Sequence, residues 1–451
     1  MRPVIGESEL RELGRTHGSP KLLAQLADGQ RTRRLLLLRA LLDAADEAPA
    51  PTAARVREHW QLLESAERCS PEAARRVVHY PLVGTWAAYS LRLLLHGAAA
   101  GQLDDLAHLG AIAAAAAARA GLAFRLRLPS KDGMLCLPTL GALRCPGSAQ
   151  VTISGTGTRL RLTPDRGRTT EIRCGAGDHA TWRSSDSRWK PLSQLGGVGR
   201  PVLLDDADRY RVLGGDGEGT PSGTSLDHRQ QERWQRTWHE TLPILHVGGD
   251  QRPTDLDALL DCVVPLADQS AVSPHGAGAT HRSGTRHNAF GAVLSSQPSG
   301  PQSFAATLVH ELQHTKLSAL SELVPLHTAD NRPRHWAPWR PDPRPFEGLL
   351  HGCYAHLALS AHWQTVALAA KDPADRDRGW AEHARCREQI NAVLPLLAGS
   401  RHLTPNGRVL VAEMEDHLAR LKEIPPPDGH VIRAGAYVET AWAVWRRRHA
   451  R

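Results

Sequence analysis

The stretch Ser303–Leu323, SFAATLVHELQHTKLSALSEL, predicts a long helix and sets the expectation for the fold around it. No Pro or Gly interrupts it before Pro325, and Ser303 is the expected N-cap residue. Its apolar packing positions are Leu308, Leu312, Leu317 and Leu320. We therefore expect this segment to be a helix with one side packed into a core.

The helix carries an HExxH motif made by His310, Glu311 and His314. Residues four apart lie on the same face of a helix, so the two imidazoles can converge on one metal ion. The chain has 24 histidines, so the short pattern can also arise by chance. The predicted helical context is what the motif requires, and it favours a metal site.

A metal site needs a third protein ligand, and the next predicted helix, Arg344–Ala370, offers Glu347 and His351 four residues apart. With either residue as the third ligand, two kinds of metal site remain possible. In a zinc peptidase, Glu311 would be the general base acting on metal-bound water. In a non-heme Fe(II) site, a 2-oxo acid and dioxygen would take the remaining positions. His356 and His362, further along this helix, are expected at the surface or behind the ligands.

Between the two predicted helices lies HWAPWRPDPRP, residues 335–345, whose prolines exclude a helix. This connection holds Arg340 and Arg344 between aromatic residues. A guanidinium fixed near a metal suits the distal carboxylate of a 2-oxo acid, which arginine binds with two hydrogen bonds. The alternative is a tight turn packed by Pro and Trp, with both arginines facing water.

The rest of the chain divides by pattern into three segments. Residues 1–122 read as helical, residues 123–224 alternate apolar with polar residues as strands do, and residues 225–451 are mainly helical. The expected fold class is therefore α+β and predominantly helical. Loops within 270–300 are the expected entrance for substrate, and their His275, His281 and His287 recur at a spacing that matches no standard metal-ligand pattern.

The amino-acid composition and net charge exclude several classes of protein. The 451 residues are 41% hydrophobic and 23% charged, which is ordinary globular usage. No window approaches the ~18 uninterrupted apolar residues of a membrane span, and acidic residues stand where a signal peptide would be apolar. We therefore expect a cytoplasmic protein with no membrane partner. A net charge of +8 without any nucleic-acid-binding motif favours an acidic peptide over nucleic acid as partner.

Two runs of sequence resemble a known family. They are Ala289–Leu326 and Trp336–Leu359, and they are similar to the HExxH-motif proteins understood as 2-oxoglutarate- and Fe(II)-dependent peptide β-hydroxylases. These enzymes modify ribosomally made peptides, sometimes beside or fused to a radical SAM maturase. Weaker similarity extends to Thr32–Ala45, His79–Ala87 and Leu137–Gly141. The specific part of the resemblance is confined to residues 289–359.

The resemblance implies a reaction and its components. Fe(II) would be bound, 2-oxoglutarate would be decarboxylated with dioxygen, and a side-chain β-carbon of a ribosomal precursor peptide would be hydroxylated. The partners implied are that precursor peptide and a radical SAM maturase of the same gene cluster. Proteolysis is not implied. The competing hypotheses are a zinc-dependent HExxH metallopeptidase and a non-catalytic precursor-peptide binding protein that keeps a structural metal.

The resemblance also implies roles for individual residues. The metal ligands fall on His310, His314 and His351, and the arginines that hold the co-substrate fall on Arg340 and Arg344. A site of three histidines departs from the usual two histidines and one carboxylate of such iron sites. Glu347 stays the alternative third ligand, although its position is expected to be small in this family. Glu311 would then orient a neighbouring group instead of activating water.

Overall fold

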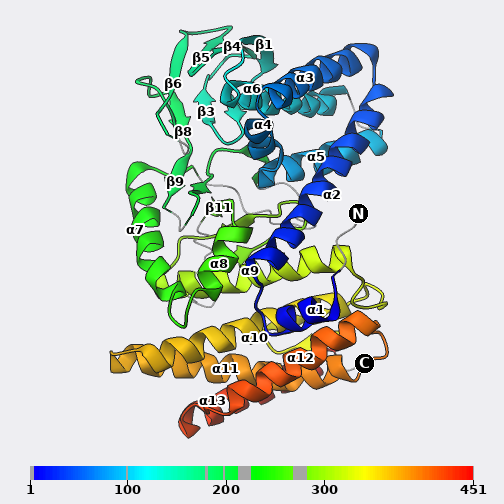
Figure 1. The fold of residues 1–451 in the computed structure, drawn as a ribbon, viewed down its shortest axis with the longest axis vertical. Helices are drawn as coiled ribbons and strands as arrows, with labels where there is room; N and C mark the ends of the chain where they lie inside the picture. Colours follow the sequence, from blue (N-terminus) through cyan, green and yellow to red (C-terminus); the bar gives the residue numbers. More distant parts are fainter. Residues whose placement is uncertain are drawn as a thin grey trace. The chain divides into compact units, whose positions relative to one another are not determined.

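The computed structural model describes residues 5–97, 100–177, 181–196, 199–211, 225–267 and 282–449 (Figure 1). Helices make up 58% of the structure and strands 16%, which confirms the predicted α+β, predominantly helical class. The chain forms two compact units, and both are discontinuous in sequence. Unit 1 comprises Met1–Gln30, Arg236–Leu260 and Pro298–Arg451, and unit 2 comprises Arg31–Gln235 and Asp261–Gln297. The divisions fall within the helices α2 (Pro20–Asp46) and α7 (His228–Leu245).

Unit 2 begins with a helical layer, as the sequence predicts. Its helices after α2 are α3 (Ala50–Cys69), α4 (Pro71–Val78), α5 (Pro81–Leu95), the 3-10 helix η1 (Ala100–Ala107) and α6 (His108–Arg119). The alanine run Ala111–Ala118 fills α6 and is almost fully buried. Small side chains allow close approach, so α6 packs directly on α3, α4 and strand β1 (Phe124–Pro129).

The β-rich part of unit 2 forms three sheets. An antiparallel sheet has the order β1, β4 (Gln150–Thr156), β5 (Arg159–Pro164), β6 (Thr170–Cys174) and β7 (Trp182–Arg183). A second consists of β2 (Met134–Leu137), β3 (Gly141–Arg144) and β8 (Trp189–Pro191). The third has the order β12 (Ser283–Gly284), β13 (Ala292–Ser295), β11 (Cys262–Pro265), β10 (Val202–Leu204) and β9 (Ser193–Leu195). The predicted alternation is plain in β5, where buried and exposed side chains follow each other in turn.

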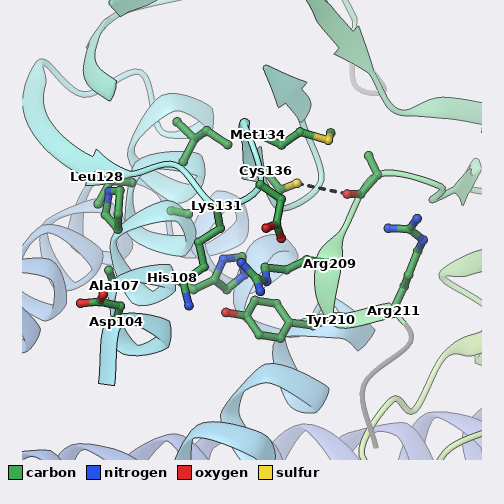
Figure 2. A pocket seen from close by; sticks show the side chains of 15 residues that line it. Asp104, Ala107, His108, Leu128, Lys131, Met134, Cys136, Arg209, Tyr210 and Arg211 are labelled. Carbon is green, nitrogen blue, oxygen red and sulfur yellow. Dashed lines mark hydrogen bonds between the residues drawn. The ribbon is translucent and has the colours of Figure 1, made fainter. Parts of the chain in front are cut away.

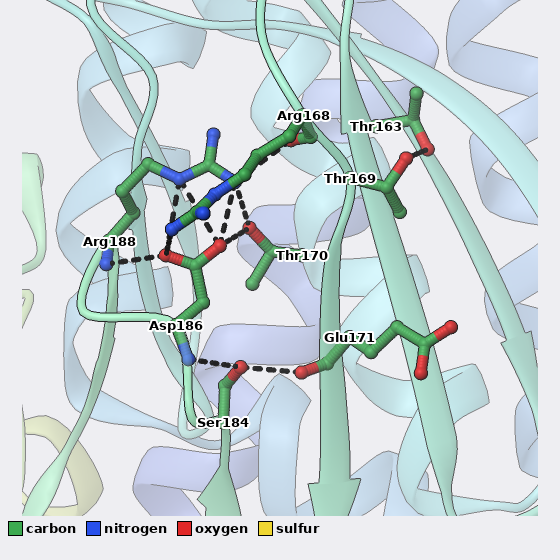
Figure 3. Close-up of polar contacts among 8 residues, drawn as sticks. All are labelled: Thr163, Arg168, Thr169, Thr170, Glu171, Ser184, Asp186 and Arg188. Atoms are coloured by element: carbon green, nitrogen blue, oxygen red, sulfur yellow. Dashed lines mark hydrogen bonds and ion pairs between the residues drawn. The ribbon is translucent and has the colours of Figure 1, made fainter.

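A polar cluster fastens the loop between β7 and β8 (Figure 3). The Asp186 carboxylate accepts hydrogen bonds from the Arg188 guanidinium at 2.7 Å and from the Thr170 hydroxyl at 2.8 Å. The backbone N–H of Arg188 donates to the same carboxylate at 3.0 Å. These donors favour the ionised form, so the pKa of Asp186 lies below its ordinary value, chiefly through Arg188.

Unit 1 is a helical assembly around one central helix. Its helices are α1 (Glu7–Gly14), α8 (Gln251–Leu259), α9 (Pro301–Leu323), α10 (Phe346–Ala369), α11 (Pro373–Ala398), α12 (Pro405–Lys422) and α13 (Asp428–His449), with the ends of α2 and α7. Helix α10 packs against α9, α11 and α12, while α1 covers α12 (Figure 1). The helices predicted after residue 301 are confirmed, with ends that shift by a few residues.

Helix α9 begins earlier than predicted. Its first residue is Pro301, so Ser303 is the third residue of the helix and not the N-cap residue. The Ser303 hydroxyl accepts a hydrogen bond from the N–H of Gly300 at 3.2 Å and donates to the Gly300 carbonyl at 2.8 Å. Proline fits the first turn because its missing N–H would have no helical partner there. Ser303 therefore closes the end of the helix from inside it.

The loops expected within 270–300 meet the described residues only in part. Residues 268–281 lie outside the described part of the chain, and His275 and His281 with them. Further along, Ala292–Ser295 form strand β13, which pairs in parallel with β11. Among the described helices, none combines the length and the apolar character needed to cross a membrane.

Candidate metal centre

The two histidines of the HExxH motif face each other on α9, as the helical spacing requires. The Nε2 atoms of His310 and His314 are 3.0 Å apart, and the ring centroids are 4.6 Å apart. Two nitrogens bound at ~2.1 Å to one ion lie roughly 3.0 Å apart when they subtend a right angle. The same separation suits an N–H···N hydrogen bond between the rings. The pair therefore has a spacing that fits a shared metal ion without rearrangement of the helix.

Both rings are set to be neutral at physiological pH. Burial lowers the pKa of His310 to about 4. Burial also lowers the pKa of His314 well below its ordinary value, and the neighbouring His310, His351, His356 and Arg344 add to the effect. A histidine must be neutral to offer a lone pair to a metal. The environment thus keeps the two imidazoles in the form that ligation needs.

Helix α10 adds two more imidazoles to this position. The His351 ring stacks nearly parallel to His314, with centroids 5.7 Å apart. The His356 ring stands perpendicular to His310 at 5.4 Å. Four histidines from two packed helices therefore gather at one place in unit 1. His351 was predicted there as a ligand. His356, which was expected at the surface or behind the ligands, lies buried against His310.

His356 is held from two sides. Its Nδ1 donates a hydrogen bond to the carbonyl of Gly352 at 2.8 Å, which leaves the Nε2 lone pair for another partner. Trp339 stacks on the ring with centroids 4.4 Å apart. A Cβ at Gly352 would lie 2.4 Å from Trp339 Cζ2, so the glycine is what admits the tryptophan. Burial lowers the pKa of His356 to about 3.

Glu347, the alternative third ligand, lies at an exposed position of α10. Its carboxylate acts on His327, where it raises a pKa that burial lowers more strongly. Of the α10 side chains, His351 and His356 therefore lie at the HExxH histidines. Glu347 interacts with His327 instead.

The Pro-rich connection forms a hairpin of β14 (His335–Ala337) and β15 (Arg340–Arg344), in agreement with the prediction that it is not helical. Arg344 is close enough to His314 for its charge to contribute to the lowered pKa of that ring. Its buried Nε has no hydrogen-bond partner among the described residues, and its Nη1 is 3.8 Å from the Asp342 carboxylate. A Cβ at Gly348 would lie 2.8 Å from Arg344 Nη2, so α10 leaves room for this guanidinium.

Arg340 has a different setting. Its Nε donates to the Asp342 carboxylate at 2.8 Å, and 46% of its side chain is exposed. The two arginines, which were predicted to act together, therefore differ in their contact with Asp342. Arg340 donates a hydrogen bond to its carboxylate, whereas Arg344 only approaches it. Arg344 is the better placed of the two to meet a ligand at the histidine cluster.

Glu311 of the motif is buried, with 3% of its surface exposed. The Thr315 hydroxyl donates to the backbone carbonyl of Glu311 at 3.1 Å, one turn further along α9. The residue is therefore fixed within the packed face of the helix beside the two histidines.

The donor set fits a borderline metal ion. Neutral imidazoles suit iron and zinc alike, and a site with protein ligands on one side leaves positions for other ligands. Within the described ranges, no group of three or more His, Cys, Asp or Glu side chains is already arranged to hold a metal ion. The residues that fit are His310 and His314, with His351 and His356 adjacent.

Sequence reasoning missed one residue of this cluster, Trp339, and left the setting of His356 open between the surface and the region behind the ligands. His356 follows His351 by five positions, a spacing that puts the two rings on different sides of α10 and gives no one-face signal. Trp339 lies in the connection whose aromatic residues were read only as packing for the arginines. The signal available in the sequence was the glycine at 352, one turn before His356 and small enough for a ring to approach.

Compared with known proteins, the chain matches no protein-family model. It also matches no curated protein.

Proposed function

We propose that this protein is an Fe(II)- and 2-oxoglutarate-dependent dioxygenase that hydroxylates a side-chain β-carbon in a ribosomally made precursor peptide. The observation that carries the proposal is the 3.0 Å separation of the two HExxH Nε2 atoms, with the α10 histidines packed on the pair and the Arg344 charge acting on His314. The family resemblance of residues 289–359 supports the same reading. The proposed setting is the cytoplasm, with a radical SAM maturase of the same gene cluster as a further partner.

His310 and His314 would hold the iron, and α10 would supply the third ligand. We assign that role to His351, whose ring lies parallel to His314 and whose position the resemblance implies. His356 packs on His310 and stacks with Trp339. Its role is to fix the orientation of His310.

Arg344 would bind the distal carboxylate of 2-oxoglutarate. Its Nε is buried and has no acceptor among the described residues, which is costly for a charged group unless a ligand supplies one. Arg340 would add positive charge from the more exposed side of Asp342. The hairpin and Gly348 hold the Arg344 guanidinium in place before the co-substrate arrives.

When bound, Fe(II) would supply the activation of dioxygen, one oxygen atom of which enters a C–H bond of the peptide as C–OH while the other enters succinate as 2-oxoglutarate loses carbon dioxide. The chain's own contribution is positional. The imidazoles stay neutral, Arg344 orients the co-substrate, and the packed side chains of α9 and α10 limit the access of water. Glu311, buried on α9, orients a neighbouring group in this scheme.

The decisive experiment is anaerobic reconstitution with Fe(II), 2-oxoglutarate and the precursor peptide encoded beside the gene, followed by exposure to oxygen. We expect a peptide heavier by one oxygen atom and an equal amount of succinate. Unchanged peptide together with no succinate would refute the proposal. An anaerobic titration of the Fe(II) protein with 2-oxoglutarate gives a second readout, because a chelated 2-oxo acid produces a visible charge-transfer band.

The anchor role of Arg344 has its own test. We expect Arg344→Gln to weaken 2-oxoglutarate binding at least roughly tenfold, because a charge-assisted bond is lost, and to leave the iron content unchanged. Arg332→Gln is the matched control, since that side chain is 84% exposed and pairs with Asp330. Equal affinity for 2-oxoglutarate in the two variants would remove Arg344 from the site.

A zinc peptidase is the second candidate, favoured by the HExxH motif itself with its buried acid. In that case zinc would support peptide cleavage, and Glu311→Gln would abolish it. If Glu311→Gln leaves hydroxylation and succinate formation measurable, the acid is not a water-activating base. A non-catalytic peptide-binding protein would bind the precursor and keep tightly held zinc without forming any product.

A further inference from the structure

Unit 2 contains a cavity of about 140 Å³ (Figure 2). It lies where the start of α6 meets the β1–β2 connection and the 3-10 helix η2 (Arg209–Arg211). None of its lining residues takes part in the proposed metal centre, and all of them belong to unit 2. The cavity is therefore a candidate for a separate ligand.

Cationic side chains line one part of the cavity, and several of their nitrogens lack acceptors. The Nε and Nη1 atoms of Arg209 and the Nε of Arg211 are buried without a hydrogen-bond partner among the described residues. The Arg211 Nη1 donates to the Asp208 carbonyl at 2.5 Å. Leaving N–H groups of a charged guanidinium buried and unbonded is unfavourable. An anion in the cavity would supply the missing acceptors.

A ring platform fixes the position of Arg209. Its guanidinium carbon lies 5.6 Å from the centroid of Tyr210, and the His108 ring packs on the same tyrosine at 4.6 Å. Figure 2 shows the His108 and Arg209 side chains together above Tyr210. The Nε2 atom of His108 is also buried without a partner among the described residues. This platform thus offers both a fixed cation and a polar ring nitrogen to one ligand.

The third cation at the cavity is already neutralised. The Lys131 ammonium lies 2.6 Å from the Asp105 carboxylate, which also accepts a hydrogen bond from the Tyr210 hydroxyl at 2.8 Å. Asp104 and Asp132 are exposed acidic residues of the lining. Asp208 interacts with both arginines and Asp205 with Arg211, so the arginines are partly compensated within the protein. What they offer a ligand is their unbonded N–H groups, and the acidic surroundings oppose a dianion such as phosphate.

The other walls are apolar. They are formed by Ala107, Ala111, Leu128, Pro129, Met134 and Leu135. Small sites of this kind bind molecules that pair an apolar body with a single polar group. We propose that the cavity binds a monoanionic carboxylate with a short aliphatic chain, its carboxylate on Arg209 and Arg211 and its chain against these apolar walls.

Two sources share this chemistry: a free aliphatic acid, and the C-terminal carboxylate of a peptide that ends in an apolar residue. Isothermal titration of the full chain with hexanoate and with N-acetyl-Ala-Ala-Leu distinguishes them, because the better binder identifies the source. Acetate lacks the aliphatic chain, and inorganic phosphate lacks it and carries more charge. We expect hexanoate or the tripeptide to bind at least roughly tenfold more tightly than acetate or phosphate.

The variant that tests the charge is Arg209→Gln, which we expect to weaken binding at least roughly tenfold. Its matched control is Arg127→Gln on β1, because Arg127 is exposed on the opposite side of the strand from the cavity residue Leu128. Ala107→Leu fills the cavity without changing charge, so it tests the site even if Arg209→Gln does not fold. Equal affinity in Arg209→Gln and Arg127→Gln, undiminished binding to Ala107→Leu, preference for phosphate, or no saturable binding of any carboxylate overturns the proposal.

Discussion

Replacing Asp255 by Ala is the most informative test of how α9 is held in unit 1. Asp255 on α8 and Lys316 on α9 form an ion pair with 2.9 Å between charged groups, and the two side chains are 1% and 0% exposed. Lys316 Nζ also donates to the Thr16 carbonyl at 3.1 Å. Arg252 Nη1 lies 3.5 Å from the same carboxylate. Asp255 is thus the anion that compensates two buried cations.

The magnitude follows from this geometry. At 2.9 Å the attraction between Lys316 and Asp255 is roughly 6 kcal/mol with an effective dielectric constant of ~20. Part of that is offset because the variant no longer has to bury the carboxylate, and measured losses on breaking buried pairs are ~3–5 kcal/mol. We therefore expect Asp255→Ala to lower the free energy of unfolding by ~3–5 kcal/mol. Lys316→Met should lower it less, by ~1–3 kcal/mol, because Asp255 keeps Arg252 as a partner.

Urea unfolding followed by far-ultraviolet circular dichroism measures these values in the two single variants and the double variant. We expect the double variant to be at least ~1.5 kcal/mol more stable than additive losses would make it, since the pair is removed once. Asp257→Ala is the control, because Asp257 is on the same helix but exposed. A loss of less than ~1 kcal/mol for Asp255→Ala, or strict additivity, would refute the reasoning.

Three further outcomes are expected. Equilibrium dialysis should show that His351→Ala loses Fe(II) as fully as His310→Ala does, and that His356→Ala weakens iron binding less. If His356→Ala instead weakens iron binding more than His351→Ala, then His356 is the ligand. Gly352→Ala should destabilise the protein by ~1–3 kcal/mol, because its Cβ has no room, and a thermal shift within error of wild type would contradict this. Asp186→Asn should cost ~1.5–3 kcal/mol at pH 7. Because the native pKa of Asp186 is depressed, that difference should shrink as the pH falls below about 5 and vanish in strong acid, and a pH-independent difference would disprove it.

Local pattern predicted the parts of this protein that local physics controls. The HExxH spacing put His310 and His314 on one face of a helix, and their Nε2 atoms are 3.0 Å apart. Prolines excluded a helix at 335–345, where the structure has a hairpin. Alternating polarity indicated the strands after residue 123, including β5 with its alternately buried side chains.

The remainder depends on contacts between distant segments. The pattern divides the chain at 122 and 224, whereas the contacts join residues 1–30 and 236–260 to the C-terminal helices. The local sequence patterns around Thr16, Asp255 and Lys316 do not predict that Lys316 contacts the other two residues. For the same reason, helical spacing could not decide between Glu347 and His351 as the third ligand. In the structure Glu347 is exposed and His351 stacks on His314.

The charges of the centre argue for an anionic co-substrate more strongly than the motif does. A divalent ion on His310 and His314, as proposed, would together with the Arg344 guanidinium bring three positive charges to a place where burial already depresses the pKa of His314. Glu311 and Asp342 return two negative charges at most. The balance therefore stays positive by at least one charge until an anionic ligand enters, and a keto diacid meets that need whereas a neutral peptide bond does not. By linkage, metal and diacid should strengthen each other's binding, and this mutual dependence separates the oxygenase from the peptidase even before a peptide is known.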